Sequence, residues 1–258
     1  MALPVPAYDA DGITLHAGDC IQIMPLLKEP VALVVADLPY SVTVADWDRE
    51  IDAKMLWHCY NALTGPRTPV ILFGSGLFAA RMTLSNASAF RYDLCWDKEA
   101  ITGHLNAKRQ PLRAHESLLV FYGQQPHYDP QMIYTGRSSP SRGTKVERTN
   151  RHYGQYVNTP VVEQDGFQHP RSILKFKRPK LPKGKGHPSQ KPVALLEWIV
   201  RSYTKPGDLV LDNTAGSATA LVAARNCGRR AVGIEMHEPF VELAVARLAS
   251  GSEGDRWD

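Results

Sequence analysis

The chain has 258 residues, and its hydrophobic fraction of 43% and charged fraction of 22% are ordinary for a globular protein with a full apolar core. Its four cysteines lie far apart and form no Cys-x-x-Cys pair, so we expect no disulfide framework and no metal. We see no signal peptide and no apolar stretch long enough to span a membrane, which favours a cytoplasmic protein with no membrane partner.

Positive charge is concentrated in the middle of the chain. Residues 98–187 hold 16 Lys and Arg against 6 Asp and Glu, whereas the remaining residues hold 14 against 20. A basic segment inside an acidic frame indicates one part that binds a polyanion.

The first 122 residues show alternating strand and helix patterns. Residues 31–36 form an apolar run with no polar face, as in a buried parallel strand, and Pro39 ends it. A helix is expected over residues 52–63, and further strands over residues 70–73, 94–96 and 118–122.

The chain loses this regularity at about residue 123 and regains it near Pro192. Such a long stretch without clear elements is usually functional or disordered. The expected elements that follow are helices over 193–203, 218–226 and 239–248 and strands over 209–211 and 231–234. We therefore expect a catalytic half over residues 1–122, an inserted target-recognition segment over 123–186 and a cofactor-binding half over 187–258.

One candidate site is a turn between a predicted strand and a predicted helix. Its residues are Asp212, Asn213, Thr214, Ala215, Gly216 and Ser217. Backbone N–H groups at such a turn can face a ligand, and Glu235, at the end of the next strand, can accept the hydroxyls of a ribose. The alternative interpretation is an ordinary tight turn with a solvated acid.

A second candidate site is Asp37-Leu38-Pro39-Tyr40, at the carboxyl end of the strand over residues 31–36. A carboxylate and a backbone carbonyl can accept both N–H bonds of an aromatic amine, and an aromatic ring can stack on its base. Alone, this segment is equally a strand ending in a turn. A third segment, His187-Pro188-Ser189-Gln190-Lys191-Pro192, is on its own a loop before a helix.

The order of these three segments resembles the β-group of S-adenosylmethionine-dependent DNA amino-methyltransferases, of the adenine-N6 type. Gly18-Asp19-Cys20 resembles the N-terminal segment of that family, and residues 106–109 and 115–121 resemble its middle strands. The resemblance covers about residues 13–248.

The resemblance implies a doubly wound, mainly parallel, Rossmann-like α/β sheet in which the catalytic half precedes the cofactor half. Asp37 and the Leu38 carbonyl would then hold the N6 amine of a flipped adenine, with Pro39 fixing the turn and Tyr40 stacking on the base. The methyl group would move by direct displacement. The implied S-adenosylmethionine site comprises Asp19, Cys20, His187, Ser189, Lys191, Asp212, Asn213, Thr214, Ala215, Gly216, Ser217 and Glu235.

The resemblance also places DNA recognition in the basic middle segment. Double-stranded DNA is the expected partner, restriction–modification the expected context, and a homodimer is a further expectation for which the sequence shows no interface. The candidate DNA-binding residues are Arg137, Arg142, Lys145, Arg148, Arg151, Arg171, Lys175, Lys177 and Arg178. The cofactor turn departs from the family pattern, because Asn213, Thr214 and Ala218 replace a proline, a phenylalanine and a glycine.

Three alternatives remain open from the sequence. N4-cytosine is an alternative target, although Asp37 favours adenine because relatives acting on cytosine more often begin this tetrapeptide with serine. Residues 74–79 nearly match a dinucleotide-binding turn, with Asp93 as its ribose acid, which suggests an oxidoreductase. A DNA-binding protein without catalysis is the third alternative.

Overall fold

The computed structural model describes residues 2–40, 50–136, 166–179 and 189–251, and the backbone of residues 146–150 and 154–158. The chain divides into two compact units. The larger comprises Met1–Asp129 with Ser172–Asp258, and the smaller is Pro130–Arg171. Within the described part of the chain, no helix has the length and apolar character needed to cross a membrane.

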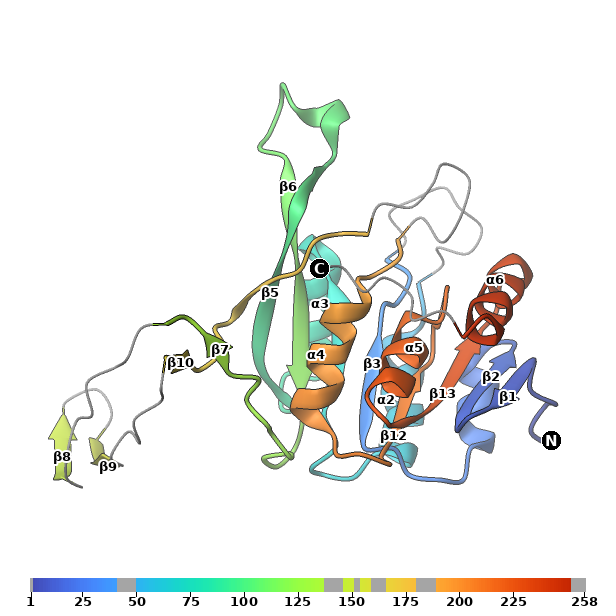
Figure 1. Cartoon of the computed structure of the whole chain (residues 1–258), viewed down its shortest axis with the longest axis horizontal. Coiled ribbons are helices and arrows are strands. Elements are labelled where there is room, and N and C mark those ends of the chain that lie inside the picture. The colour runs from blue at the N-terminus through green and yellow to red at the C-terminus, as the bar shows by residue number, and fades with distance from the viewer. Residues whose placement is uncertain are drawn as a thin grey trace. The chain divides into compact units, whose positions relative to one another are not determined.

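The larger unit is built on a nine-stranded sheet (Figure 1). In spatial order its strands are β1 (Tyr8–Ala10), β2 (Ile13–Ala17), β13 (Arg230–Glu235), β12 (Leu209–Asp212), β3 (Leu33–Ala36), β4 (Val70–Gly74), β6 (Arg113–Phe121), β5 (Phe90–Thr102) and β11 (Ile173–Lys175). The pairs from β2 through β4 are parallel, as is β5 with β11, whereas β1–β2, β4–β6 and β6–β5 are antiparallel. The mainly parallel sheet expected from the sequence is confirmed.

Helices cover both faces of this sheet. On one face lie α1 (Cys20–Ile23), the 3-10 turn η1 (Met24–Leu26), α2 (Ala53–Leu63) and α3 (Gly76–Ser85). On the other face lie α4 (Val193–Tyr203), α5 (Thr219–Asn226) and α6 (Glu238–Ala249). Helices on both faces explain why the central strands read as continuous apolar runs.

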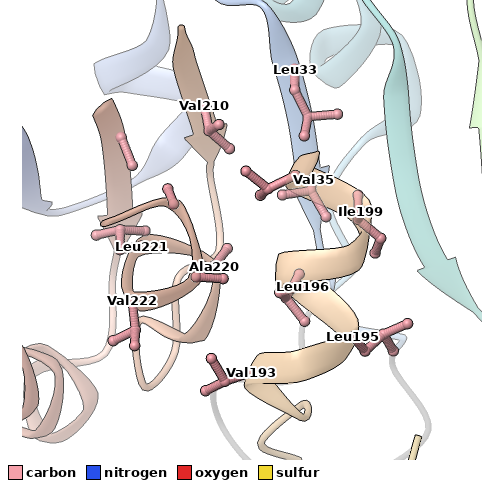
Figure 2. Close-up of a cluster of buried hydrophobic side chains, with 14 of the residues drawn as sticks. Leu33, Val35, Val193, Leu195, Leu196, Ile199, Val210, Ala220, Leu221 and Val222 are labelled. Carbon is pink, nitrogen blue, oxygen red and sulfur yellow. The ribbon is translucent and has the colours of Figure 1, made fainter. Parts of the chain in front are cut away.

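Strand β3 shows how the two faces are filled. Leu33 and Val35 belong to the cluster packed under α4 and α5, whereas Val34 and Ala36 belong to the cluster on the opposite face. Figure 2 shows Leu33 and Val35 along β3, with Leu196 on the neighbouring helix α4. Burying each such aliphatic side chain contributes about 1.5–3 kcal/mol.

The parallel pairing of β3 with β12 positions the candidate site. Leu33 is opposite Val210 and Val34 is opposite Leu211, so the two carboxyl ends lie side by side. Strands β12 and β13, expected in the cofactor half, thereby lie between β2 and β3, expected in the catalytic half. This is the permuted order expected from the resemblance.

The smaller unit contains two short antiparallel ladders. One pairs β7 (Ile133–Tyr134) with β10 (Phe167–Gln168), and the other pairs β8 (Val146–Asn150) with β9 (Gly154–Asn158). The Tyr134 and Phe167 rings meet edge to face with centroids 5.2 Å apart. The sequence pattern did not predict these strands.

Candidate active site

A cavity of about 660 Å³ opens at the carboxyl edge of the large sheet. Residues that follow or end four adjacent parallel strands line it: Asp19 after β2, Glu235 in β13, Asp212 in β12 and Asp37 after β3. Open α/β sheets bind their ligands at this edge. The carboxylates of Asp37 and Asp212, expected in different halves of the chain, share this one cavity.

Two side chains hold Asp37, one neutral and one positively charged. The Tyr40 hydroxyl donates a hydrogen bond to Oδ1 of Asp37 at 2.8 Å, and Lys191 Nζ donates to Oδ2 at 2.5 Å. Tyr40 also stacks on Phe78 of α3, with ring centroids 4.5 Å apart. The geometry therefore fixes both oxygens of the Asp37 carboxylate at the cavity wall.

Lys191 belongs to a chain of alternating charges. Its Nζ also lies 3.3 Å from Oε2 of Glu116, and the other oxygen of Glu116 lies 3.2 Å from Lys98 Nζ. Lys191 and Lys98 expose only 10% and 4% of their side chains, so solvent screens these pairs weakly. Each buried ammonium thus depends on a carboxylate for its counter-charge.

The charge chain determines the protonation of its members. Burial raises the pKa of Asp37, and the Lys191 ammonium offsets part of that effect. Burial would raise the pKa of Glu116 too, but Lys191 and Lys98 together outweigh it and lower this pKa. Burial opposes the charged form of Lys191, yet the carboxylates of Asp37 and Glu116 raise its pKa above the ordinary value.

Main-chain N–H groups of the turn after β12 hold two carboxyl groups that line the same cavity, Asp212 at the end of β12 and Glu235 at the end of β13. The Gly216 N–H donates to Oε2 of Glu235 at 2.7 Å, and the His237 N–H donates to Oε1 at 2.8 Å. Asp212 accepts a 3.1 Å bond from the Thr214 N–H. Burial raises the pKa of Asp212 to about 8, so this carboxyl favours a cationic partner.

Two of the three departures from the family pattern have hydrogen-bond partners, and the third has an unusual backbone conformation. Thr214 Oγ1 donates to the backbone carbonyl of Asp37 at 3.1 Å. Asn213 is buried, accepts a 2.7 Å bond from the Tyr60 hydroxyl, and its amide donates toward Cys20 Sγ at 3.5 Å. Ala218, at the start of α5, has a φ of 59°, a left-handed conformation that favours glycine.

Most of the candidate site residues meet in the cavity. Those that line it are Asp19, Cys20, Asp37, Leu38, Pro39, Tyr40, Ser189, Lys191, Asp212, Asn213, Thr214, Ala215, Gly216, Ser217 and Glu235. Lys191, which the resemblance places in the cofactor site, donates a hydrogen bond to Asp37. His187 lies outside the described residues.

The candidate DNA-binding residues are more scattered. Arg178 lines the cavity, Lys175 in β11 and Lys177 just after it are exposed, and Arg171 is exposed in the smaller unit. Arg137, Arg142, Lys145 and Arg151 lie outside the described residues, as does the side chain of Arg148. Their role in DNA binding therefore remains a prediction.

Sequence reasoning missed the polar cavity residues of the β5–β6 pair. Lys98, Arg113 and Glu116 line the cavity, and Arg113 Nη1 donates to Ser75 Oγ at 2.9 Å. A sequence signal was available for Glu116, because this charged residue stands two positions before the buried apolar run that starts at Leu118.

Comparison with known proteins agrees with this arrangement. The family model described as DNA methylase (N6_N4_Mtase) matches residues 31–246. The Type II methyltransferase M2.DpnII of Streptococcus pneumoniae is 36% identical over 277 residues, covering 96% of this chain and 94% of the relative. The DNA adenine methyltransferase YhdJ of Escherichia coli (strain K12) is 37% identical over 249 residues, covering 91% and 81%.

Solved structures share the fold at lower identity. The M1.HpyAVI–SAM complex superposes with a TM-score of 0.62 at 20% identity, covering 92% of this chain and 98% of that chain. The PvuII DNA methyltransferase, described as cytosine-N4-specific, superposes with a TM-score of 0.70 at 16% identity, covering 96% and 90%. The family model and the two relatives together show that this chain belongs to the DNA methylase family.

Proposed function

We propose that this chain transfers a methyl group from S-adenosylmethionine to the N6 amine of adenine in DNA. The observation that carries the proposal is the shared cavity, which joins the Asp37 tetrapeptide to the turn between Asp212 and Ser217. The two relatives at 36% and 37% identity support adenine, since one is named as an adenine methyltransferase and both match most of the chain.

The cofactor side of the cavity fits a cationic nucleoside. Each oxygen of Glu235 accepts one main-chain N–H and retains a lone pair for a ribose hydroxyl. Asp212, whose pKa burial raises to about 8, gains from a positive group placed beside it. When bound there, S-adenosylmethionine supplies a methyl group on a positively charged sulfur.

The catalytic side of the cavity fits an aromatic amine. Asp37 accepts one N–H of the amine and the Leu38 carbonyl accepts the other, so the amine lone pair points toward the cofactor side. Tyr40 keeps Asp37 in place through its hydroxyl and presents a ring face to the base. Burial raises the pKa of Asp37, and the Lys191 ammonium offsets part of this effect, which favours the ionised carboxylate as the stronger acceptor of an N–H.

The substrate is extruded from double-stranded DNA in this proposal, because a paired amine cannot reach a cavity enclosed by strand ends. The exposed cations Lys175 and Lys177 and the basic middle segment support phosphate binding. We place the protein in the cytoplasm beside its DNA, and a homodimer is compatible with the family.

Incubation with S-adenosylmethionine and mixed-sequence DNA, followed by sequencing that detects modified bases, tests the proposal. We expect N6-methyladenine at one sequence motif and none with Asp37→Ala, whose cofactor affinity stays unchanged. Methylation at cytosine N4 would overturn the choice of base. DNA binding without any modification would favour the non-catalytic alternative, and binding of NAD in place of S-adenosylmethionine would favour an oxidoreductase.

A further inference from the structure

The hairpin of β5 and β6 extends past the carboxyl edge of the sheet (Figure 1). Between its strands, residues 103–111 are all exposed, including the short 3-10 turn η2 (His104–Asn106). We call residues 100–113 the hairpin tip. The tip belongs to the larger unit, as does the cavity.

The hairpin tip combines apolar exposure with positive charge. Leu105 is 87% exposed and Ile101 is 64% exposed. The tip contains Lys108, Arg109 and Arg113 and no acidic residue. An exposed apolar side chain among cations, with no anion, fits a polyanion that also offers a hydrophobic surface.

Residues at the two ends of the hairpin tip and in the strands next to it form one wall of the cavity. Lys98 and Thr102 from β5, and Arg113 and Glu116 from β6, line it. Leu105 follows Thr102, which lines the cavity, by three residues, so their Cα atoms lie at most about 11 Å apart. A ligand whose reacting part enters the cavity therefore meets the hairpin tip with its remaining parts.

The backbone leading to the tip departs from regular pairing. The register of β5 against β6 shifts between Asp97 and Thr102. Glu99 has a φ of 48° and Gly103 has a φ of 83°. Irregularities of this kind redirect a strand beside an active site. We therefore infer that these irregular residues bend β5 and direct the hairpin tip beyond the edge of the sheet.

We propose that the hairpin tip enters the DNA beside the target base. Lys108 and Arg109 bind phosphates, and Leu105 fills the stacking space that the flipped base leaves. Apolar side chains inserted between base steps are a known means of opening a duplex, and an unstacked base needs such a replacement. This proposal rests on the proposed function, since it requires a base to enter the cavity.

The charge contacts are tested by salt dependence of DNA binding. In the double variant Lys108→Ala/Arg109→Ala, we expect the log–log slope of affinity against salt to become shallower by about 1.8, since each lost phosphate contact removes about 0.9. The matched control is Lys28→Ala/Lys205→Ala, which removes two exposed cations from the opposite, amino-terminal edge of the strands. A slope equal in both double variants overturns the proposal.

The Leu105 contact is tested with two duplexes that carry the identified target motif. In Leu105→Ala, we expect methylation of the paired duplex to fall about tenfold, a loss typical of a missing transition-state contact. A duplex with an abasic site opposite the target adenine should restore the rate to near that of the unmodified protein, because its base is already unpaired. Leu84→Ala, which truncates a residue 76% exposed on α3, is the control.

Each further outcome decides the proposal. An equal loss on both duplexes with unchanged cofactor affinity overturns the role of Leu105, and so does a change in oligomeric state with no change in DNA binding, which would assign the tip to a second copy of this chain. If the unmodified protein binds DNA but transfers no methyl group, the proposed function fails, while the salt slope still reports the phosphate contacts.

Discussion

Lys191 Nζ lies 2.5 Å from Oδ2 of Asp37 and 3.3 Å from Oε2 of Glu116. The ammonium thus bridges the carboxyl expected to hold the substrate amine and a second carboxyl from the antiparallel hairpin. Because both are largely shielded from water, the protonation of Asp37 depends on Lys191.

Lys191→Met is expected to move the acid limb of the pH–rate profile to higher pH. Burial already raises the pKa of Asp37, and removing the nearby positive charge raises it further. Activity needs the ionised carboxylate, so kcat/KM should fall at neutral pH, by about tenfold for each unit of further shift, and recover in part on alkalinisation. Steady-state rates measured from about pH 6 to about pH 10 give the shift of the acid limb.

The Lys191 variants also distinguish its two proposed roles. Lys191→Arg retains the charge and is expected to keep the original acid limb. A large loss of S-adenosylmethionine affinity in Lys191→Met, with an unchanged pH profile, would instead assign Lys191 to the methionine end of the cofactor.

Glu116→Gln is expected to destabilise the fold by about 3 kcal/mol at neutral pH, because it leaves two buried ammonium groups without their shared partner. Lys191 and Lys98 hold the pKa of Glu116 below its ordinary value, so its stabilisation is present above that value and is lost as pH falls through the folded pKa. Denaturant unfolding at pH 7 and in acid measures the free energy of unfolding. The difference between the unmodified protein and Glu116→Gln should be smaller in acid.

Glu99→Gln provides the control for Glu116, because Glu99 is an exposed acid on the neighbouring strand β5. Its free energy of unfolding should change little. Equal destabilisation by the two substitutions would contradict the proposed network.

Asp212→Asn is expected to raise stability more at pH 8 than at pH 5. Burial raises the folded pKa of Asp212 to about 8, so between its unfolded pKa and pH 8 the folded state retains a proton that the unfolded state has lost. The native protein therefore loses stability with rising pH through this group, by at most about 4 kcal/mol over three units. Thermal unfolding at both pH values measures the effect, and a pH-independent difference would contradict it.

Thr214→Val is expected to slow methyl transfer about fivefold to tenfold by removing one hydrogen bond worth about 1 kcal/mol. The lost donor is Thr214 Oγ1, which holds the backbone carbonyl of Asp37. Thr214→Ser retains the hydroxyl and should restore most of the rate. If the serine variant is as slow as the valine variant, the retained hydroxyl does not sustain the rate, which would contradict the role of this hydrogen bond.

The sequence was sufficient to place Asp37, Asp212 and Glu235 together, because carboxyl ends of parallel strands share one edge. The helix expected over residues 193–203 has the observed bounds of α4, since its apolar spacing and flanking prolines are local signals. The fold class and the family are confirmed.

The sequence was not sufficient for the charge chain, because Glu116 and Lys98 meet through the register of an antiparallel pair. Trp96 is opposite Glu116, twenty residues away, and no local pattern fixes that register across an irregular stretch. The two-residue strands β7 and β10 are too short to produce a detectable alternation.

The bond from Thr214 to Asp37 uses a main-chain oxygen, which every amino acid carries. The side chain at position 37 can therefore be exchanged while the hydrogen bond from Thr214 to the main chain of residue 37 stays in place. An inactive Asp37 variant should therefore keep the cofactor turn linked to the end of β3 and be suitable for trapping bound DNA.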